Sequence, residues 1–243
     1  MYIDYSGIFH ASSKDLTGNG TVKIPQDTTK WPKEWSTTYY KTYPRVPKVQ
    51  LLRQGASADL FEILTCRRSR RDFMRTPIDM EKISQLLLYS CGTQNSSKEK
   101  YRTHPSGGAR FPIEHYLLVF AGSKEIPSGV YHYNISEHSL DVLWERKFTS
   151  NDIAKLFVYP WAQDATCALV MTAVFWRNQM KYGERGYRYM LLEAGHIGEN
   201  VYLVSEGLDM KCCAIGGSVD QRVEDLLNID GITESVVHSF ILG

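Results

Sequence analysis

The chain has 243 residues, of which 43% are hydrophobic and 23% are charged, and its formal net charge is +1. This length is sufficient for one large domain or two small ones with a sizeable core. The near-neutral charge argues against a nucleic-acid-binding domain, which is strongly basic.

The sequence shows no sign of export or membrane insertion. The longest apolar run, residues 165–176, is too short to span a bilayer, and no cleavable export signal opens the chain. The five cysteines are an odd number and lack paired spacing. We therefore expect reduced thiols and a cytoplasmic protein without membrane contact.

Residues 1–52 have a different character from the rest of the chain. The pairs Trp31-Pro32, Tyr43-Pro44 and Val46-Pro47 interrupt a stretch rich in tyrosine and tryptophan. This pattern predicts an irregular, extended N-terminal arm that lies on a surface such as that of a partner subunit. We expect residues 53–243 to form one domain.

Helices and strands then follow without regular alternation. Apolar spacing predicts helices over residues 57–66 and 79–90, the second capped by Asp79, and residues 94–100 read as a polar loop. The strands expected next, at residues 115–121, 130–134 and 139–145, precede a buried strand within 165–176.

The longest predicted helix covers residues 184–205 and stops at Gly207. Gly195 and Gly198 lower its helix propensity, so we expect another backbone to approach closely there. A strand at 211–215, a short helix at 219–227 and a strand at 236–242 complete the chain. Together these elements indicate an α+β fold.

Residues 66–73 place four arginines and Ser69 within five positions. Arginine matches phosphate oxygens in a bidentate manner, and a serine hydroxyl can complete such a cradle. A solvated charge run or a nucleic-acid patch is the plainer interpretation. In a nearly neutral chain, a local site for a phosphorylated cofactor fits better.

Two further glycine-rich segments accompany this run, at residues 105–109 and 215–217. Each glycine pair alone is more typical of a turn, but glycine also lets backbone N–H groups approach a ring or phosphate. The sequence has neither the G-x-G-x-x-G nor the G-x-x-x-x-G-K-[ST] pattern, which counts against Rossmann and P-loop sites. The three segments together favour a cofactor site.

The motifs at residues 67–73, 105–112, 129–133, 187–196 and 215–217 resemble the nitroreductase superfamily of flavoproteins. Their order is similar to that of its SagB-type, or azoline dehydrogenase, branch. The resemblance covers essentially the whole chain. The C-terminus lacks the basic Lys-x-Arg pair of common nitroreductases. This difference weakens the resemblance to common nitroreductases but not the resemblance to the SagB-type branch.

The resemblance implies a nitroreductase-like fold, with a mixed sheet flanked by helices in an intertwined homodimer, and FMN bound at the dimer interface. Residues implied to hold the FMN phosphate and ribityl chain are Arg67, Arg68, Ser69 and Arg71. From the other subunit, the flavin would be lined by Pro105, Ser106 and Gly107. The flavin edge would meet the turn formed by Ile215, Gly216 and Gly217, with the Gly216 N–H near flavin N5.

Lys181 and Tyr182 correspond to a Lys-Tyr pair that this branch uses in proton removal. From sequence alone, a lysine beside a glycine-bounded turn is usually solvated. Lysine can act as a base only if burial or a nearby cation lowers its pKa. The resemblance makes Lys181 the expected base and Tyr182 its helper.

Other combinations are weaker. Glu193-x-x-His196 with Cys212-Cys213 lacks both a second E-x-x-H helix and C-x-x-C spacing, so we expect no metal. His104 is either a turn histidine or a residue that faces the site.

The sequence thus predicts an FMN-dependent dehydrogenase that oxidises thiazoline or oxazoline rings to thiazole or oxazole in a peptide natural product. Oxygen would reoxidise the flavin, and cyclodehydratase proteins are candidate partners. The alternatives are an NAD(P)H-dependent nitro or quinone reductase and a non-catalytic scaffold subunit of an azole synthetase complex.

Overall fold

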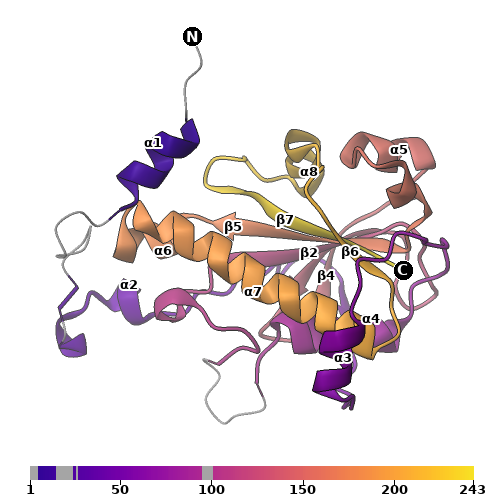
Figure 1. Ribbon diagram of the computed structural model, residues 1–243, viewed down its shortest axis with the longest axis horizontal. Helices are drawn as coiled ribbons and strands as arrows, with labels where there is room; N and C mark the ends of the chain where they lie inside the picture. The colour runs from indigo at the N-terminus through magenta and orange to yellow at the C-terminus, as the bar shows by residue number, and fades with distance from the viewer. Residues whose placement is uncertain (1–4, 15–23, 26, 95–100) are drawn as a thin grey trace.

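The computed structural model describes residues 5–14, 24–25, 27–94 and 101–243 (Figure 1). These residues form a seven-stranded sheet in the order β1-β4-β3-β2-β5-β7-β6. The strands are β1 (Lys48–Gln50), β2 (Ile113–Val119), β3 (Gly129–Asn134), β4 (Ser139–Glu145), β5 (Cys167–Val174), β6 (Cys212–Ile215) and β7 (Glu234–Leu242).

The helices are α1 (Tyr5–Ser12), α2 (Lys33–Ser36), α3 (Leu60–Cys66), α4 (Met80–Cys91), α5 (Ser150–Leu156), α6 (Trp176–Tyr182), α7 (Arg185–Gly207) and α8 (Asp220–Leu227). Short 3-10 helices lie at Thr28–Lys30, Gly107–Ala109 and Pro160–Asp164. Within the described ranges, no helix combines the length and apolar character needed to cross a membrane.

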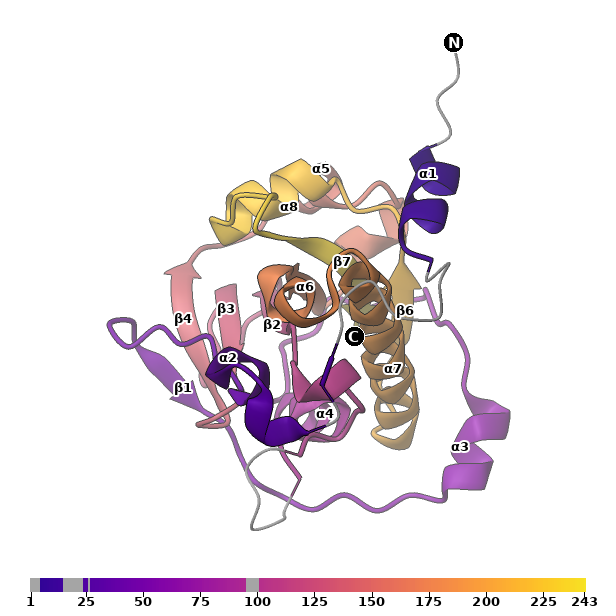
Figure 2. The same cartoon turned by 90° about the vertical axis from the view of Figure 1, so that its left-hand side faces the viewer.

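The α+β class is confirmed, with helices on both sides of the sheet (Figures 1 and 2). One detail of the prediction was wrong, because every described strand pair is antiparallel and the sheet is not mixed. The short β2–β3 and β3–β4 connections require antiparallel neighbours, since a parallel pair needs a long crossover.

The predicted elements reappear with shifted ends. The first predicted helix begins only at Leu60, because the Asp59 side chain caps it by accepting the Glu62 N–H at 2.9 Å. The last strand starts two residues earlier than predicted, at Glu234. Most of the loop predicted at residues 94–100 lies outside the described residues.

The N-terminal region is less irregular than predicted, since it contains α1, α2 and β1. The part around Trp35 lies on this chain's own α6. The Trp35 indole donates to the Met180 carbonyl at 3.1 Å, and Arg110 donates to the Trp35 carbonyl at 2.8 Å. The division of the chain at residue 52 stays a prediction.

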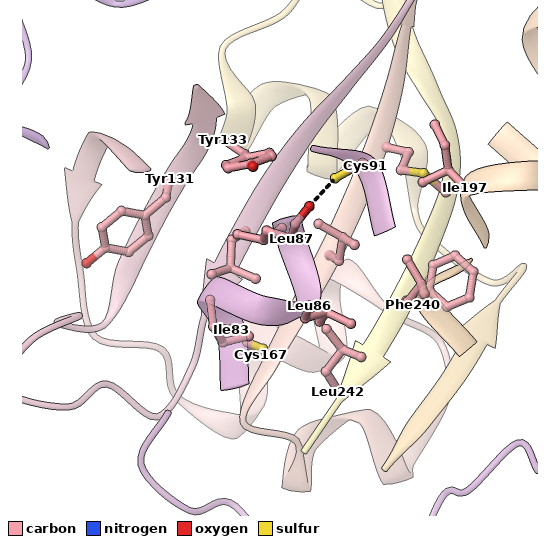
Figure 3. Packing of buried hydrophobic residues seen from close by; sticks show 14 of the residues in the cluster. Ile83, Leu86, Leu87, Cys91, Tyr131, Tyr133, Cys167, Ile197, Phe240 and Leu242 are labelled. Atoms are coloured by element: carbon pink, nitrogen blue, oxygen red, sulfur yellow. Dashed lines mark hydrogen bonds between the residues drawn. The ribbon is translucent and has the colours of Figure 1, made fainter. Parts of the chain in front are cut away.

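Both faces of the sheet are buried, and β5 shows why its sequence reads as a continuous apolar run. Cys167, Leu169 and Met171 join the core under α4 and α7, whereas Ala168 and Val170 join the core under α5 and α8. Alternate residues of a strand point to opposite faces, so both sets must be apolar. Figure 3 shows the first of these two cores.

The two glycines of α7 have different roles. A Cβ at Gly198 would lie 3.0 Å from the Phe240 ring of β7, so this position allows close packing on the sheet. The neighbour is a side chain, not the backbone that was predicted. Gly195 has no atom within 4 Å of an added Cβ and lies on the outward face with Leu192, which is 60% exposed.

Leu86→Ala should lower the free energy of unfolding by about 2–5 kcal/mol, because this fully buried side chain would leave a cavity between α4 and the sheet. Ile232→Ala is the control, since Ile232 is 78% exposed and its truncation should change stability by less than about 0.5 kcal/mol. Denaturant titration of both variants measures the difference. Equal losses would contradict the assignment of Leu86 to the core.

Candidate functional site

The arginine run follows α3 and lies beside the edge strand β6. The backbone N–H of Arg70 donates to the Cys212 carbonyl at 2.9 Å, and the Arg70 side chain pairs with Glu206 at 2.7 Å. Arg70 is therefore neutralised within the chain, in agreement with its omission from the predicted phosphate contacts.

The predicted phosphate ligands remain available. Arg68, Ser69 and Arg71 are exposed, and Arg67 is half-buried with its guanidinium 5.0 Å from the centre of the Tyr202 ring. No carboxylate in the described part of the chain pairs with Arg67, Arg68 or Arg71. Three guanidinium groups without a carboxylate partner on one short segment are suited to bind an anion.

Tyr202 of α7 connects this segment to the glycine turn. Its hydroxyl accepts the Ala214 N–H at 2.8 Å and hydrogen-bonds the Ser69 hydroxyl at 2.9 Å. Ser69 is thereby held beside β6, which ends at Ile215 and leads into Gly216 and Gly217. Sequence reasoning missed Tyr202; its position one helical turn after Gly198, on the face that meets β7, was the available signal.

The two glycines of the turn are used differently. Gly216 is exposed, and no atom lies within 4 Å of a Cβ added there, so its backbone is open to a flat ligand. A Cβ at Gly217 would lie 2.5 Å from Val158, so packing alone requires glycine at this position. We call Arg67, Arg68, Ser69, Arg71 and the turn 215–217 the arginine half of the site.

The loop of Pro105, Ser106 and Gly107 is fixed on the first half of α7. The Ser106 hydroxyl donates to Glu193 at 2.5 Å and accepts the Phe111 N–H at 2.9 Å. Glu193 is only 1% exposed, so this contact is strongly protected from water. A hollow lies between the loop and the helix, lined by Pro105, Ser106, Gly107, Tyr189, Leu192, Glu193 and His196.

His104 supports this loop from inside. It is 4% exposed, and its Nε2 lies 3.5 Å from Glu193. Burial lowers the pKa of His104, although Glu193 acts in the opposite direction. The structure therefore favours a buried supporting histidine over one that faces a ligand.

Lys181 and Tyr182 end α6 and meet the same loop at Gly108. Lys181 is 2% exposed, so the solvated lysine that its sequence context suggests is not what the fold contains. A Cβ at Gly108 would lie 3.2 Å from Lys181 Nζ and would clash with the Tyr182 hydroxyl. Gly108 also has φ +64°, so both its conformation and its neighbours require glycine.

The electrostatics of Lys181 suit a base. Burial lowers the pKa of its ammonium group, and the nearby guanidinium of Arg110 lowers it further. Burial raises the pKa of Tyr182, which keeps its hydroxyl protonated. We call Lys181, Tyr182 and the loop of Pro105, Ser106 and Gly107 the lysine half of the site.

The two halves contact different stretches of α7. Tyr189 packs against Gly107 and lies edge-on to Tyr182 at 5.0 Å, whereas Tyr202 contacts Ser69. These two tyrosines are thirteen positions apart in α7, which corresponds to about 20 Å. Residues that the sequence assigned to one site are thus divided within one chain into two groups.

The residues considered for a metal are also separated. Glu193 holds Ser106, whereas Cys212 and Cys213 lie buried in β6. In the described ranges, no group of three or more His, Cys, Asp or Glu side chains could hold a metal ion.

The sequence is similar to one archaeal protein and to two bacterial proteins. A protein classed as a nitroreductase, MJ1384 of Methanocaldococcus jannaschii, is 28% identical over 70% of this chain and 84% of its own length. The trifolitoxin-processing protein TfxB of Rhizobium leguminosarum is 33% identical over 57% of this chain and 38% of its own length. The microcin B17-processing protein McbC of Escherichia coli is 26% identical over 64% of this chain and 58% of its own length. The chain thus spans only part of these two processing proteins.

Solved structures share the fold. A protein from Anabaena variabilis classed as a nitroreductase superposes with a TM-score of 0.71 at 26% identity, over 98% of this chain and 45% of the other. The Escherichia coli microcin synthetase McbBCD complex with truncated pro-MccB17 contains a chain with the same fold. It superposes with a TM-score of 0.60 at 19% identity, over 98% of this chain and 91% of the other.

The family model described as "Nitroreductase family" matches residues 64–243, which include both halves of the site. This match confirms the resemblance inferred from the motifs, and the two processing proteins among the relatives support the predicted branch. The chain therefore belongs to the nitroreductase family.

Proposed function

We propose that this protein is an FMN-dependent dehydrogenase that oxidises thiazoline or oxazoline rings in a peptide to thiazole or oxazole. The observation that carries the proposal is the buried Lys181, whose pKa is lowered, beside Tyr182 and the glycine loop. Relatives that process trifolitoxin and microcin B17 support a peptide substrate.

The arginine half fits FMN. Arg67, Arg68 and Arg71 offer uncompensated charge to one terminal phosphate, and Ser69 is held ready by Tyr202. The open backbone at Gly216 suits the edge of the flavin ring, where an N–H donor stabilises the reduced form. When bound, FMN would supply the hydride acceptor, and oxygen is the final acceptor that we propose.

The lysine half would supply the base. The α-proton of an azoline is acidified by the neighbouring imine and carbonyl groups, and neutral Lys181 would remove it. Tyr182, held protonated by burial, would donate a hydrogen bond to the substrate carbonyl. The loop fixed by Ser106 and Glu193 would keep the reacting groups aligned and exclude water.

Both halves would serve one FMN and its substrate, and we propose that they come from two chains. Within one chain they contact α7 at positions about 20 Å apart. A homodimer in which the lysine half of one protomer faces the arginine half of its partner would complete two equivalent sites. The exposed face of α7 around Gly195 and Leu192 is suited to such an interface.

Two alternatives have support of their own. The similarity to MJ1384 favours a nitro or quinone reductase, which would be recognised by rapid flavin bleaching with NADH or NADPH. The likeness to a chain of the McbBCD complex favours assembly with partner proteins such as a cyclodehydratase, as a catalytic or a scaffold subunit.

All five cysteines are free thiols, in agreement with a cytoplasmic location.

Arg67→Ala should weaken FMN binding by about tenfold to a hundredfold, because it removes one charge-assisted phosphate contact. Fluorescence titration of the apoprotein with FMN measures the change. Arg45→Ala is the matched control, since Arg45 is exposed in the N-terminal region outside the site. A protein that stays colourless with excess FMN would exclude the whole proposal.

Lys181→Ala should lower kcat for azoline oxidation by about 10²–10⁴-fold while FMN stays bound. Because only the neutral amine accepts a proton, kcat/KM should fall as the pH drops through the pKa of Lys181. The pH at which kcat/KM falls should lie below 10.5, the ordinary pKa of lysine, since burial and Arg110 lower the pKa of Lys181. Rates measured from pH 6 to 10 test both points, and a parental rate for the variant would refute the role of Lys181.

Mixing two inactive variants tests how the site is divided. In a dimer of Lys181→Ala with the double variant Arg67→Ala/Arg71→Ala, one of the two sites receives both intact halves. Random exchange should therefore restore about a quarter of the parental activity. The control mixture of Lys181→Ala with Tyr182→Phe alters only the lysine half and should show no recovery. Absence of recovery in the first mixture would show that each site lies within one chain.

A further inference from the structure

Lys181 is covered in the structure. Its Nζ lies 3.6 Å from the centre of the Trp31 ring, and Gly108 closes another side. The residue as a whole is only 2% exposed. A general base must come within about 2.6–3.2 Å of the atom whose proton it takes. One of the walls around Lys181 must therefore move before any substrate can reach it.

Besides the Trp31 segment, Lys181 is surrounded by its own helix α6 and by the Gly108 loop, and both of these are firmly held. Arg177, one turn before Lys181 in α6, pairs with the buried Glu114 at 2.6 Å and donates to the Phe111 carbonyl at 3.0 Å. The loop that contains Gly108 is fixed through Ser106 and Glu193. Moving either wall would break buried, charge-assisted contacts, which are expensive to lose.

The third wall is weakly held. The 3-10 helix Thr28–Lys30 and α2 contain no buried residue. In the described part of the chain, Trp35 joins this segment to the domain: its indole donates to the Met180 carbonyl, and its own carbonyl accepts from Arg110. The Trp31 indole itself donates within the segment, to the Pro25 carbonyl at 2.7 Å. Segments with few buried contacts open at low free-energy cost.

We propose that residues 27–37 form a lid over the lysine half and that Trp31 is the residue that closes it. In the closed state the indole face covers the Lys181 ammonium, an arrangement that favours the charged and therefore non-basic amine. In the open state the amine is uncovered for the substrate. The lid itself follows from the geometry alone, whereas its role in turnover rests on the proposed function.

The closed lid makes substrate binding compete with the Trp31 contact. Only molecules with an open lid can bind the substrate, so the apparent substrate affinity is the intrinsic affinity multiplied by the open fraction. A contact that keeps the lid closed therefore raises KM. A cation–π contact of ordinary strength corresponds to roughly 2- to 30-fold in that fraction. Trp31 is thus a positioning residue with an effect on KM, distinct from the effect of Lys181 on kcat.

The first experiment measures the lid without any turnover. The FMN-loaded protein is treated with a small amine-acylating reagent, and the labelling rate of Lys181 is followed by peptide mass spectrometry against the exposed Lys124. Trp31→Ala should label Lys181 roughly 2- to 30-fold faster, and Trp31→Phe should lie between it and the parent. Trp144→Ala, which changes a tryptophan on β4 whose indole bonds to Leu226, should leave the rate unchanged.

Two outcomes of that experiment would overturn the lid. One is parental Lys181 that labels as fast as Lys124, because the amine is then already uncovered. The other is a Trp31→Ala variant with the slow parental rate. The Phe variant keeps a ring over the amine, so it provides a folded comparison if the Ala variant fails to fold.

The second experiment measures the lid in turnover. Trp31→Ala should lower KM for an azoline peptide roughly 2- to 30-fold, whereas Lys181→Ala lowers kcat. A higher KM would show that Trp31 binds the substrate and would overturn its role as an occluding residue. If the parental enzyme oxidises no azoline, the proposed function fails, and the labelling experiment still decides whether the lid exists.

Discussion

The packing of α7 against the sheet is the constraint on which the rest of the site depends. Met190, Ala194, Ile197 and Val201 are buried against the sheet along one face of this helix. A helix rises by a fixed amount per residue, so the points where it contacts the Pro105 loop and the arginine segment are held about 20 Å apart. Within one chain the two halves therefore contact α7 at separate positions. The same rigidity would let two chains present their halves to each other with constant spacing.

A buried ionic network fixes the other element that matters, α6. Burial alone would raise the pKa of Glu114, but the guanidinium of Arg177, with help from His132, holds it well below its ordinary value. The pair is therefore charged inside the protein, and it joins α6 to β2. Lys181 follows Arg177 by four positions and shares its side of the helix. The ion pair thus determines where the proposed base lies.

The surroundings of Lys181 combine two opposing effects. Removal of water and the charge of Arg110 favour the neutral amine, which a base requires. The face of Trp31 favours the ammonium form. The lid proposed for Trp31 would therefore change both the access to the amine and its protonation, while the fixed neighbours keep it in place. This combination would separate the proposed base from the element that controls its exposure.

The amino-acid sequence by itself determined the classes of element and the chemistry available. A continuous apolar run located β5, helical spacing located α7, and the motifs pointed to Arg67, the Pro105 loop and Lys181. These patterns are local, and local periodicity reports which residues must be buried. The sequence did not reveal that Tyr202 holds Ser69, that Glu193 holds Ser106 or that Trp31 covers Lys181. Each of these contacts joins residues far apart in the chain, so only the tertiary structure decided them.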